Sequence, residues 1–180
     1  MNWNHLMRPV AALGLSALVL LGASAALRPV AQANADAERD SVLSILLPDG
    51  APFTQEVYDG EDGAITAVYK GTGGYVIETV TAGYAGDITM LVAVDLNGAA
   101  VGVLVRDLEE TYGLGQRALT DADFLAQLLG GTGELAVGET VDALTGATVT
   151  SKAVVKAVNS ACAYVTGADV SSGATEWGDW

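Results

Sequence analysis

The sequence has almost none of the residues that build most metal and nucleophilic sites. Its 180 residues include a single cysteine, Cys162, and a single histidine, His5. One cysteine cannot close an internal disulfide or complete a Cys-rich zinc or iron–sulfur site, and a lone histidine near the N-terminus excludes a Ser-His-Asp triad in the globular part. We therefore expect no metal site, and we interpret Cys162, on the apolar stripe of a predicted helix, as a small core residue.

Basic residues are also scarce. Eight lysines and arginines stand against 22 aspartates and glutamates, which gives a formal net charge of −14. No basic stripe is available to neutralise phosphates, so the sequence predicts a protein that does not bind nucleic acid. The acidity is typical of a well-solvated surface, and the attraction of a basic partner is the alternative interpretation.

One uncharged segment lies near the N-terminus. Residues 9–27, between Arg8 and Arg28, form a continuous apolar run. A helix of about 20 residues crosses a hydrocarbon core of about 30 Å, so we predict an uncleaved transmembrane helix here. Small residues at 23–26 and 31–35 keep a cleaved signal peptide open as the alternative. Both interpretations place the rest of the chain outside the cytoplasm.

The remaining chain mixes helical and extended patterns. Acidic residues followed by apolar ones predict a short helix over residues 34–47, ended by Pro48 and Gly50. The dipeptide Asn97-Gly98 predicts a tight hairpin turn. Runs rich in β-forming residues predict four strands, over Ile65–Tyr69, Tyr75–Thr81, Ile88–Val94 and Ala100–Val105.

Two further helices are predicted after a glycine-bearing loop from Arg106 to Arg117. The first spans Asp121–Leu129, with Thr120 as its N-cap. The second runs from about Thr150 to Val165 and ends before a polar tail. Their inner faces are predicted to hold Phe124, Leu125, Leu128 and Leu129 in the first helix, and Val154, Val158, Ala161, Cys162 and Val165 in the second. Antiparallel strands with separate helices indicate an α+β domain.

The segment from Asp142 to Ser151 is the most informative about chemistry. It is a tight turn that leads into the last predicted helix. Gly146 permits a close approach of the backbone, and the hydroxyls of Thr148 and Thr150 lie where the first N–H groups of a helix are free. Such a helix start is able to bind a phosphate, while simple N-capping by Thr148 or Thr150 is the plainer interpretation.

The same segment resembles the flavin-attachment motif of the FMN-binding domain family, Asp-x-x-Ser/Thr-Gly-Ala-Thr-x-Ser/Thr. The fixed positions are filled by Asp142, Thr145, Gly146, Ala147, Thr148 and Thr150. In that family the last threonine of the Ser/Thr-Gly-Ala-Thr core forms a phosphoester with FMN. The resemblance therefore implies covalent FMN on Thr148, attached by a separate flavin transferase that uses FAD and a divalent metal and releases AMP. It also implies that the other fixed positions are cofactor-binding residues: Asp142, Thr145, Gly146, Ala147 and Thr150.

A second segment carries the same resemblance. The family has a loop Glu-Thr-Pro-Gly-Leu-Gly after a hairpin, and this chain has Glu-Thr-Tyr-Gly-Leu-Gly over residues 110–115. Tyr112 replaces the proline, so the stiffness of the loop is the property that departs from the family pattern. The resemblance implies flavin contacts, with no catalytic side chain, for Glu110, Thr111, Gly113, Leu114 and Gly115.

The order of these parts resembles the G subunits of Rnf electron-transport complexes, and more distantly the C subunits of sodium-pumping NADH:quinone reductases. We accordingly expect a single-pass protein of the cell membrane. Its expected parts are a cytoplasmic N-terminus (1–8), a transmembrane helix (9–27), a linker and amphipathic helix (28–50), an extracytoplasmic FMN-binding domain (51–166) and a loose acidic tail (167–180).

An Rnf-type subunit would carry electrons in a complex that moves them between ferredoxin and NAD, coupled to ion translocation. The implied partners are the other membrane and peripheral subunits of the complex, and the flavin transferase. Two further classes stay open: a stand-alone membrane-anchored FMN protein for extracytoplasmic electron transfer, and a non-redox binding module.

The tail repeats the core of the motif, with Thr175 as its last residue. The copy is followed by Glu176 and Trp177, so it lacks the final hydroxyl and a following apolar helix. We interpret it as a coincidence of composition, with a second flavin on Thr175 as the alternative.

Overall fold

The computed structural model describes residues 4–108 and 115–167, and for residues 4–21, Leu108 and Leu119 it describes the backbone alone. The chain divides into two compact units, Met1–Ser41 and Val42–Trp180. Helix α1 (Asn4–Leu46) forms the described part of the first unit and continues into the second. The second unit holds the sheet and the remaining helices.

Helix α1 is much longer than the helix predicted over residues 34–47. It includes residues 28–33, which were expected to be linker, and it passes through Pro29. The surrounding sequence is rich in alanine, which has the highest helix propensity, and a proline removes only one N–H donor from the helical ladder. The helix ends before Pro48, as predicted, and Pro48–Gly50 forms the short 3-10 helix η1.

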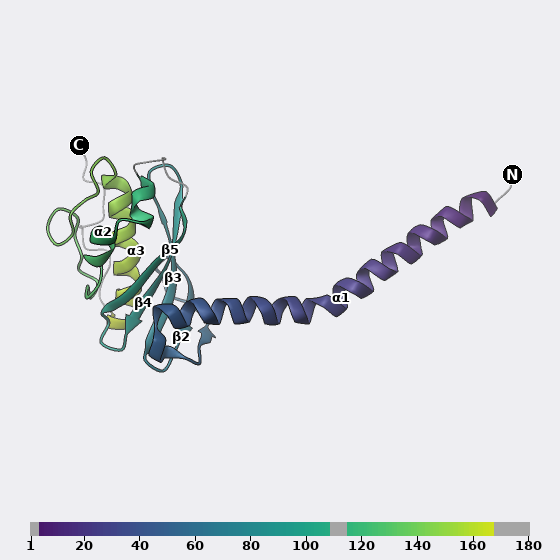
Figure 1. The fold of residues 1–180 in the computed structure, drawn as a ribbon, viewed down its shortest axis with the longest axis horizontal. Coiled ribbons are helices and arrows are strands. Elements are labelled where there is room, and N and C mark those ends of the chain that lie inside the picture. Colours follow the sequence, from purple (N-terminus) through teal and green to yellow (C-terminus); the bar gives the residue numbers. More distant parts are fainter. Residues whose placement is uncertain (1–3, 109–114, 168–180) are drawn as a thin grey trace. The chain divides into compact units, whose positions relative to one another are not determined.

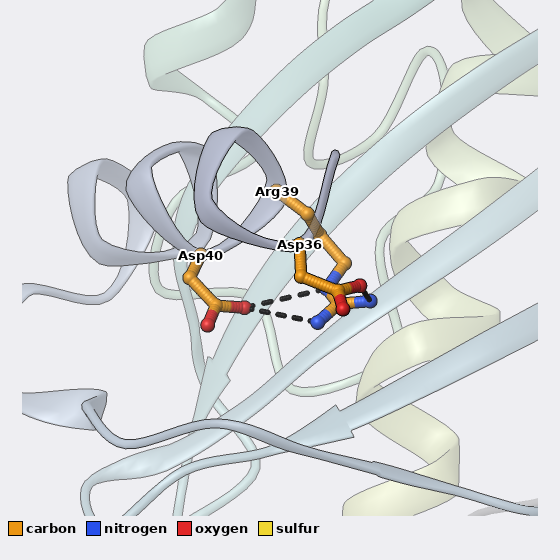
Figure 2. A network of polar contacts seen from close by, with 3 residues as sticks. All are labelled: Asp36, Arg39 and Asp40. Atoms are coloured by element: carbon orange, nitrogen blue, oxygen red, sulfur yellow. Dashed lines mark hydrogen bonds and ion pairs between the residues drawn. The ribbon is translucent and has the colours of Figure 1, made fainter. Parts of the chain in front are cut away.

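A small charge cluster lies on α1 within the first unit. Arg39 Nη1 is 3.0 Å from Asp36 Oδ1, and Arg39 Nη2 is 3.2 Å from Asp40 Oδ1 (Figure 2). These side chains are at least about one-third exposed. Pairs spaced three residues apart on an exposed helix contribute about 0.2–0.5 kcal/mol, so the cluster is a modest local support for α1.

In the described part of the chain, no helix combines the length and the hydropathy that a membrane span requires. The side chains of residues 4–21 lie outside that description. The transmembrane helix expected over residues 9–27 therefore stays a prediction.

The second unit is built on a five-stranded antiparallel sheet in which each strand pairs with the next along the chain (Figure 1). The strands are β1 (Thr54–Glu56), β2 (Ile65–Lys70), β3 (Gly74–Ala82), β4 (Asp87–Asp95) and β5 (Ala100–Leu108). The four predicted strands are confirmed as β2 to β5, each slightly longer than expected. The short strand β1 was not predicted.

The Asn97-Gly98 turn joins β4 to β5, as predicted. Gly98 has a φ of +85°, and the Asp95 carboxylate accepts hydrogen bonds of 2.9 Å from the N–H groups of Asn97 and Ala99. These hydrogen bonds, with that from Ala99 the strongest, lower the pKa of Asp95 because they stabilise its ionised form. The turn contributes to the register of the two strands.

Helix α3 (Thr148–Thr166) covers one face of the sheet (Figure 1). Ile77 of β3 and Val92 of β4 join Val154 and Val158 of α3 in one apolar cluster, and all four side chains are fully buried. Burial of one such side chain contributes about 1.5–3 kcal/mol. A helix packed on an antiparallel sheet confirms the predicted α+β class.

Cys162 belongs to this same cluster. Burial raises the pKa of its thiol to about 11, and its Sγ lies 3.3 Å from the carbonyl oxygen of Gly131. The interpretation of Cys162 as a core residue is confirmed.

The end of α1 covers the opposite face of the sheet. Leu43 and Leu47 form a second apolar cluster with Val76 of β3 and Leu91 of β4. In β3 and β4 the two clusters take alternate residues, as the pleat of a sheet requires. Because both faces are covered, the sequence of β4 is an almost unbroken apolar run.

Helix α2 (Ala122–Ala126) is shorter than the helix predicted over Asp121–Leu129. Its N-cap is Asp121, whose carboxylate accepts a 3.1 Å hydrogen bond from Phe124 N, so the expectation of Thr120 as the cap is wrong. Aspartate caps more strongly than threonine.

The inner face of α2 is only partly as predicted. Phe124 and Leu128 are buried, and Leu125 is half-buried. Leu129 is 46% exposed, contrary to expectation. Helix α2 ends at Ala126, three residues before Leu129, so the helical spacing that would place Leu129 on the inner face does not extend that far.

Candidate functional site

Three strand ends and the start of α3 meet at one end of the sheet. The register pairs Ala82, the last residue of β3, with Asp87, the first of β4, and pairs Ile88 with Leu108, the last of β5. The hydroxyl of Thr81, near the end of β3, donates a 3.0 Å hydrogen bond to the carbonyl of Ala153 in α3. The first turns of α3 therefore lie at the same end as the point where β5 leaves the sheet.

The other end of α3 confirms this orientation. Tyr164, near the C-terminus of α3, makes an edge contact with Tyr75 at the start of β3, with ring centroids 5.6 Å apart. Helix α3 thus runs antiparallel to β3. The candidate site is the end of the sheet defined by the turn Gly83–Gly86, by Leu108 and by Thr148.

A tight turn precedes α3. Gly146 has a φ of +78°, in the left-handed region that strains any residue with a Cβ. Ala147 is the N-cap residue, and its N–H donates a 2.9 Å hydrogen bond to the carbonyl of Leu144. Leu144 and Ala147 are buried, while Thr145 and Gly146 between them are exposed. The conformation explains why this position of the motif carries glycine.

Thr148 is the first residue of α3, and it is exposed. No side chain caps the helix start, so the interpretation of Thr148 or Thr150 as an N-cap is wrong. Thr150 is instead turned into the protein and is 1% exposed. The first N–H groups of a helix have no intrahelical partners, so α3 begins with free donors beside a solvent-accessible hydroxyl.

Ser151 braces this arrangement from inside. Its hydroxyl donates a 2.9 Å hydrogen bond to the carbonyl of Ala147 and accepts a 3.0 Å hydrogen bond from the N–H of Leu144. The side chain is fully buried. One hydroxyl thus ties the first turn of α3 to both ends of the preceding turn. This role was not predicted, because the spacing shows a hydroxyl four residues after Ala147 but not its partner at Leu144.

Replacing Ser151 with alanine is expected to lower the free energy of unfolding by about 1–2 kcal/mol, because the buried N–H of Leu144 loses its partner. Chemical denaturation measures the change. Ser160→Ala is the matched control, since Ser160 is a buried serine of the same helix whose Oγ has no hydrogen-bond partner among the described residues. Equal stability of the two variants would contradict the bracing role.

A backbone hydrogen bond holds Asp142 in place before the turn. Its N–H donates a 2.8 Å hydrogen bond to Oε1 of Gln127, and its side chain is exposed. The preceding Val141 is buried in the core. The Asp142 carboxylate is therefore held at the surface near the turn, where it is open to a ligand or a partner protein.

The predicted loop contacts are only partly within the described residues. Gly115 is buried and begins the 3-10 helix η2 (Gly115–Leu119), which packs against α3 and β5. Glu110, Thr111, Gly113 and Leu114 lie outside the described residues, as does Thr175 of the tail. The structure shows where this loop leaves β5 and where it ends.

The described residues contain no group of three or more His, Cys, Asp or Glu side chains that could hold a metal ion. Among the described residues at this end of the sheet, Thr145 and Thr148 are exposed hydroxyl residues, and Thr148 stands at the uncapped start of α3.

The comparison with known families matches this region. Residues 83–163 match the FMN-binding domain, a range that begins at the turn between β3 and β4 and ends within α3. It contains the loop after β5, the turn at Gly146 and Thr148. The matched range therefore includes the end of the sheet described above.

Similar proteins extend the match beyond that domain. The G subunit of the proton-translocating ferredoxin:NAD(+) oxidoreductase complex of Clostridium ljungdahlii is 31% identical, over 77% of each chain. The G subunit of the ion-translocating oxidoreductase complex is 34% identical in Pseudomonas aeruginosa, over 89% of each chain, and 31% identical in Methanosarcina acetivorans, over 71% of this chain and 75% of the relative. The chain belongs to the family of FMN-binding-domain proteins that includes these G subunits.

Proposed function

We propose that the chain is the electron-carrying flavoprotein subunit of an Rnf-type membrane complex, with FMN bound covalently to Thr148. The observation that carries the proposal is the exposed Thr148 hydroxyl at the uncapped start of α3, inside a fully filled attachment motif. In such a complex, electrons pass between ferredoxin and NAD, coupled to ion translocation. The other subunits of the complex are the proposed partners.

The residues at this site fit a phosphoester of FMN. The Thr148 oxygen is accessible, the free N–H groups of α3 point toward that end of the helix, and the positive end of the helix dipole favours a negative charge there. When bound, the flavin supplies the ability to accept and release electrons, while the protein attaches and orients it.

Flavin contacts by Glu110, Thr111, Gly113, Leu114 and Gly115 form part of the same proposal. The loop leaves β5 after Leu108, at the end of the sheet where α3 begins, and ends at Gly115, beside α3. A loop between these two points starts at the end of the sheet that holds the proposed attachment residue. Asp142 and Thr145, which are exposed in the segment before Thr148, are proposed cofactor-binding residues.

The intact mass of the protein purified from its native host tests the proposal. We expect the mass of one FMN less one water beyond that of the polypeptide, a flavin absorbance spectrum and co-purification of membrane subunits. A protein without flavin would refute the proposal and leave a non-redox module. A flavinylated protein without membrane partners would refute the complex and leave a stand-alone electron carrier.

We also propose that residues 9–27 are an uncleaved transmembrane anchor with the FMN-binding domain outside the cytoplasm. The support is the uncharged apolar run, which is long enough for a bilayer core. N-terminal sequencing of the protein from isolated membranes is expected to find the start of the chain before residue 9. A mature chain that begins near Ala33 or Asn34 would show a cleaved signal peptide instead.

A further inference from the structure

Helix α3 is open to solvent along a single strip. From Thr148 to Ala163, every residue is buried except Thr148, Val149, Lys152 and Lys156. Thr148, Lys152 and Lys156 are spaced by four residues, so they lie on one face of the helix. The exposed hydroxyl at the start of α3 is therefore followed along the same strip by two lysines.

These two lysines differ from the other cations of the second unit. Lys70, Arg106 and Arg117 lie 3.3, 3.0 and 2.9 Å from carboxylate oxygens of Glu56, Glu78 and Asp121. Lys152 and Lys156 form no ion pair with any residue that the structure describes. The chain has a net charge of −14. Two lysines without an ion pair to any described residue, on the strip of α3 that begins at Thr148, are therefore unusual in this chain.

We propose that Lys152 is a positioning residue that holds the flavin phosphate at Thr148, an inference that rests on the proposed attachment there. Side chains of a helix lean toward its N-terminus, and residues four apart have Cβ atoms about 5–6 Å apart. The Lys152 side chain is therefore long enough for its ammonium to reach a phosphate on Thr148. Lys156 lies about 12 Å along the axis from Thr148, at 1.5 Å per residue, which is too far for direct contact.

The difference in burial favours the same residue. Lys152 is half-buried and Lys156 is exposed. An ammonium partly shielded from water is screened less and interacts more strongly with a nearby anion. Of the two lysines, Lys152 is thus both close enough to a phosphate on Thr148 and less screened by water.

The proposed role of the Lys152 ammonium follows from the attachment reaction. The Thr148 oxygen forms a bond to the phosphorus of the FMN half of FAD, the bond from that phosphorus to the AMP oxygen breaks, and AMP departs. The hydroxyl proton passes to a base of the flavin transferase. No electron is gained or lost. Negative charge grows on the phosphoryl oxygens next to Lys152, and a preorganised cation stabilises it. The phosphodiester product carries one negative charge, which the Lys152 ammonium would continue to stabilise.

The test uses the full-length apo chain with the flavin transferase and FAD, and follows covalent fluorescence on denaturing gels. Lys152→Met is expected to slow attachment about tenfold at limiting FAD, the effect of one charge-assisted hydrogen bond. Lys152→Arg restores most of the rate, and Lys156→Met stays within about twofold of the wild type. Circular dichroism checks that each variant is folded.

Phosphorus NMR of the loaded protein supplies a readout that a purely structural role would not move. The phosphodiester resonance is expected to shift in Lys152→Met and to stay in place in Lys156→Met. Equal attachment rates and equal resonances in these two variants would overturn the role of Lys152 while leaving FMN on Thr148. A wild-type chain that never accepts flavin, or a flavin on another residue, would instead refute the proposed function.

Discussion

Replacing Thr148 with valine is expected to abolish covalent flavin. Valine keeps nearly the same shape but lacks the oxygen that would bond to phosphorus. Thr148 is exposed and its side chain does not cap the helix, so the free energy of unfolding should change by less than about 0.5 kcal/mol. Ultraviolet fluorescence of denaturing gels and intact mass measure the loss directly.

The tail provides the control for this experiment. Thr175 ends the second copy of the motif core, and Thr175→Val is expected to leave covalent fluorescence unchanged. If flavin persists on Thr148→Val and disappears from Thr175→Val, the attachment residue has been misassigned to α3 and belongs to the tail.

The largest effect on stability is expected from Asn159→Ala. Asn159 is buried in α3, and its amide Nδ2 donates a 2.8 Å hydrogen bond to the carbonyl of Leu135 while Oδ1 accepts a 3.0 Å hydrogen bond from the N–H of Leu135. Alanine leaves both buried backbone groups without a partner, so we expect a loss of about 2–4 kcal/mol. Thermal or chemical unfolding measures it.

Gln127→Ala is the matched control for this variant. The Gln127 amide also bridges two backbone groups, accepting from Asp142 N–H at 2.8 Å and donating to the carbonyl of Asp123 at 3.2 Å. These hydrogen bonds are at the surface, where water can replace the amide, so the loss should stay below about 1 kcal/mol. Similar losses for the two variants would contradict the importance of burial.

The sheet could be predicted closely from the sequence, for a physical reason. Strands β2 to β5 are rich in β-forming residues, and the Asn97-Gly98 turn contributes to the register of the last pair. Strand β1, Thr54–Glu56, has three polar residues and is exposed or half-buried, so it lacks the apolar alternation by which strands are recognised. Its pairing with β2 arises from tertiary structure alone.

The helices show where local patterns are insufficient. Helix α1 continues through Pro29, although a proline inside a helix loses an N–H donor and clashes with the preceding turn. Helix α2 ends at Ala126, although apolar residues continue to Leu129. Helix ends depend on competing caps and on the surrounding fold, which spacing alone does not contain.

For the candidate site, the tight turn that leads into the last helix was predicted, while the cofactor-binding roles of its residues stay predictions. Gly146 has the left-handed conformation that the motif glycine allows, and Thr148 lies exposed at the start of α3. The brace by Ser151 and the open strip with Lys152 could not be predicted, because both depend on which sides of α3 the rest of the protein covers.

The position of α3 at the end of a purely sequential sheet has a consequence for maturation. Pairing only between neighbouring strands keeps contacts local and favours rapid folding. The side chains of Ile77 and Val92 are nevertheless packed against α3, which follows all five strands along the chain. Under the proposed attachment, we expect the acceptor hydroxyl to be correctly oriented only when α3 has packed on the sheet. A covalent flavin label would then mark the molecules that have completed folding, and nascent or misassembled chains would stay colourless.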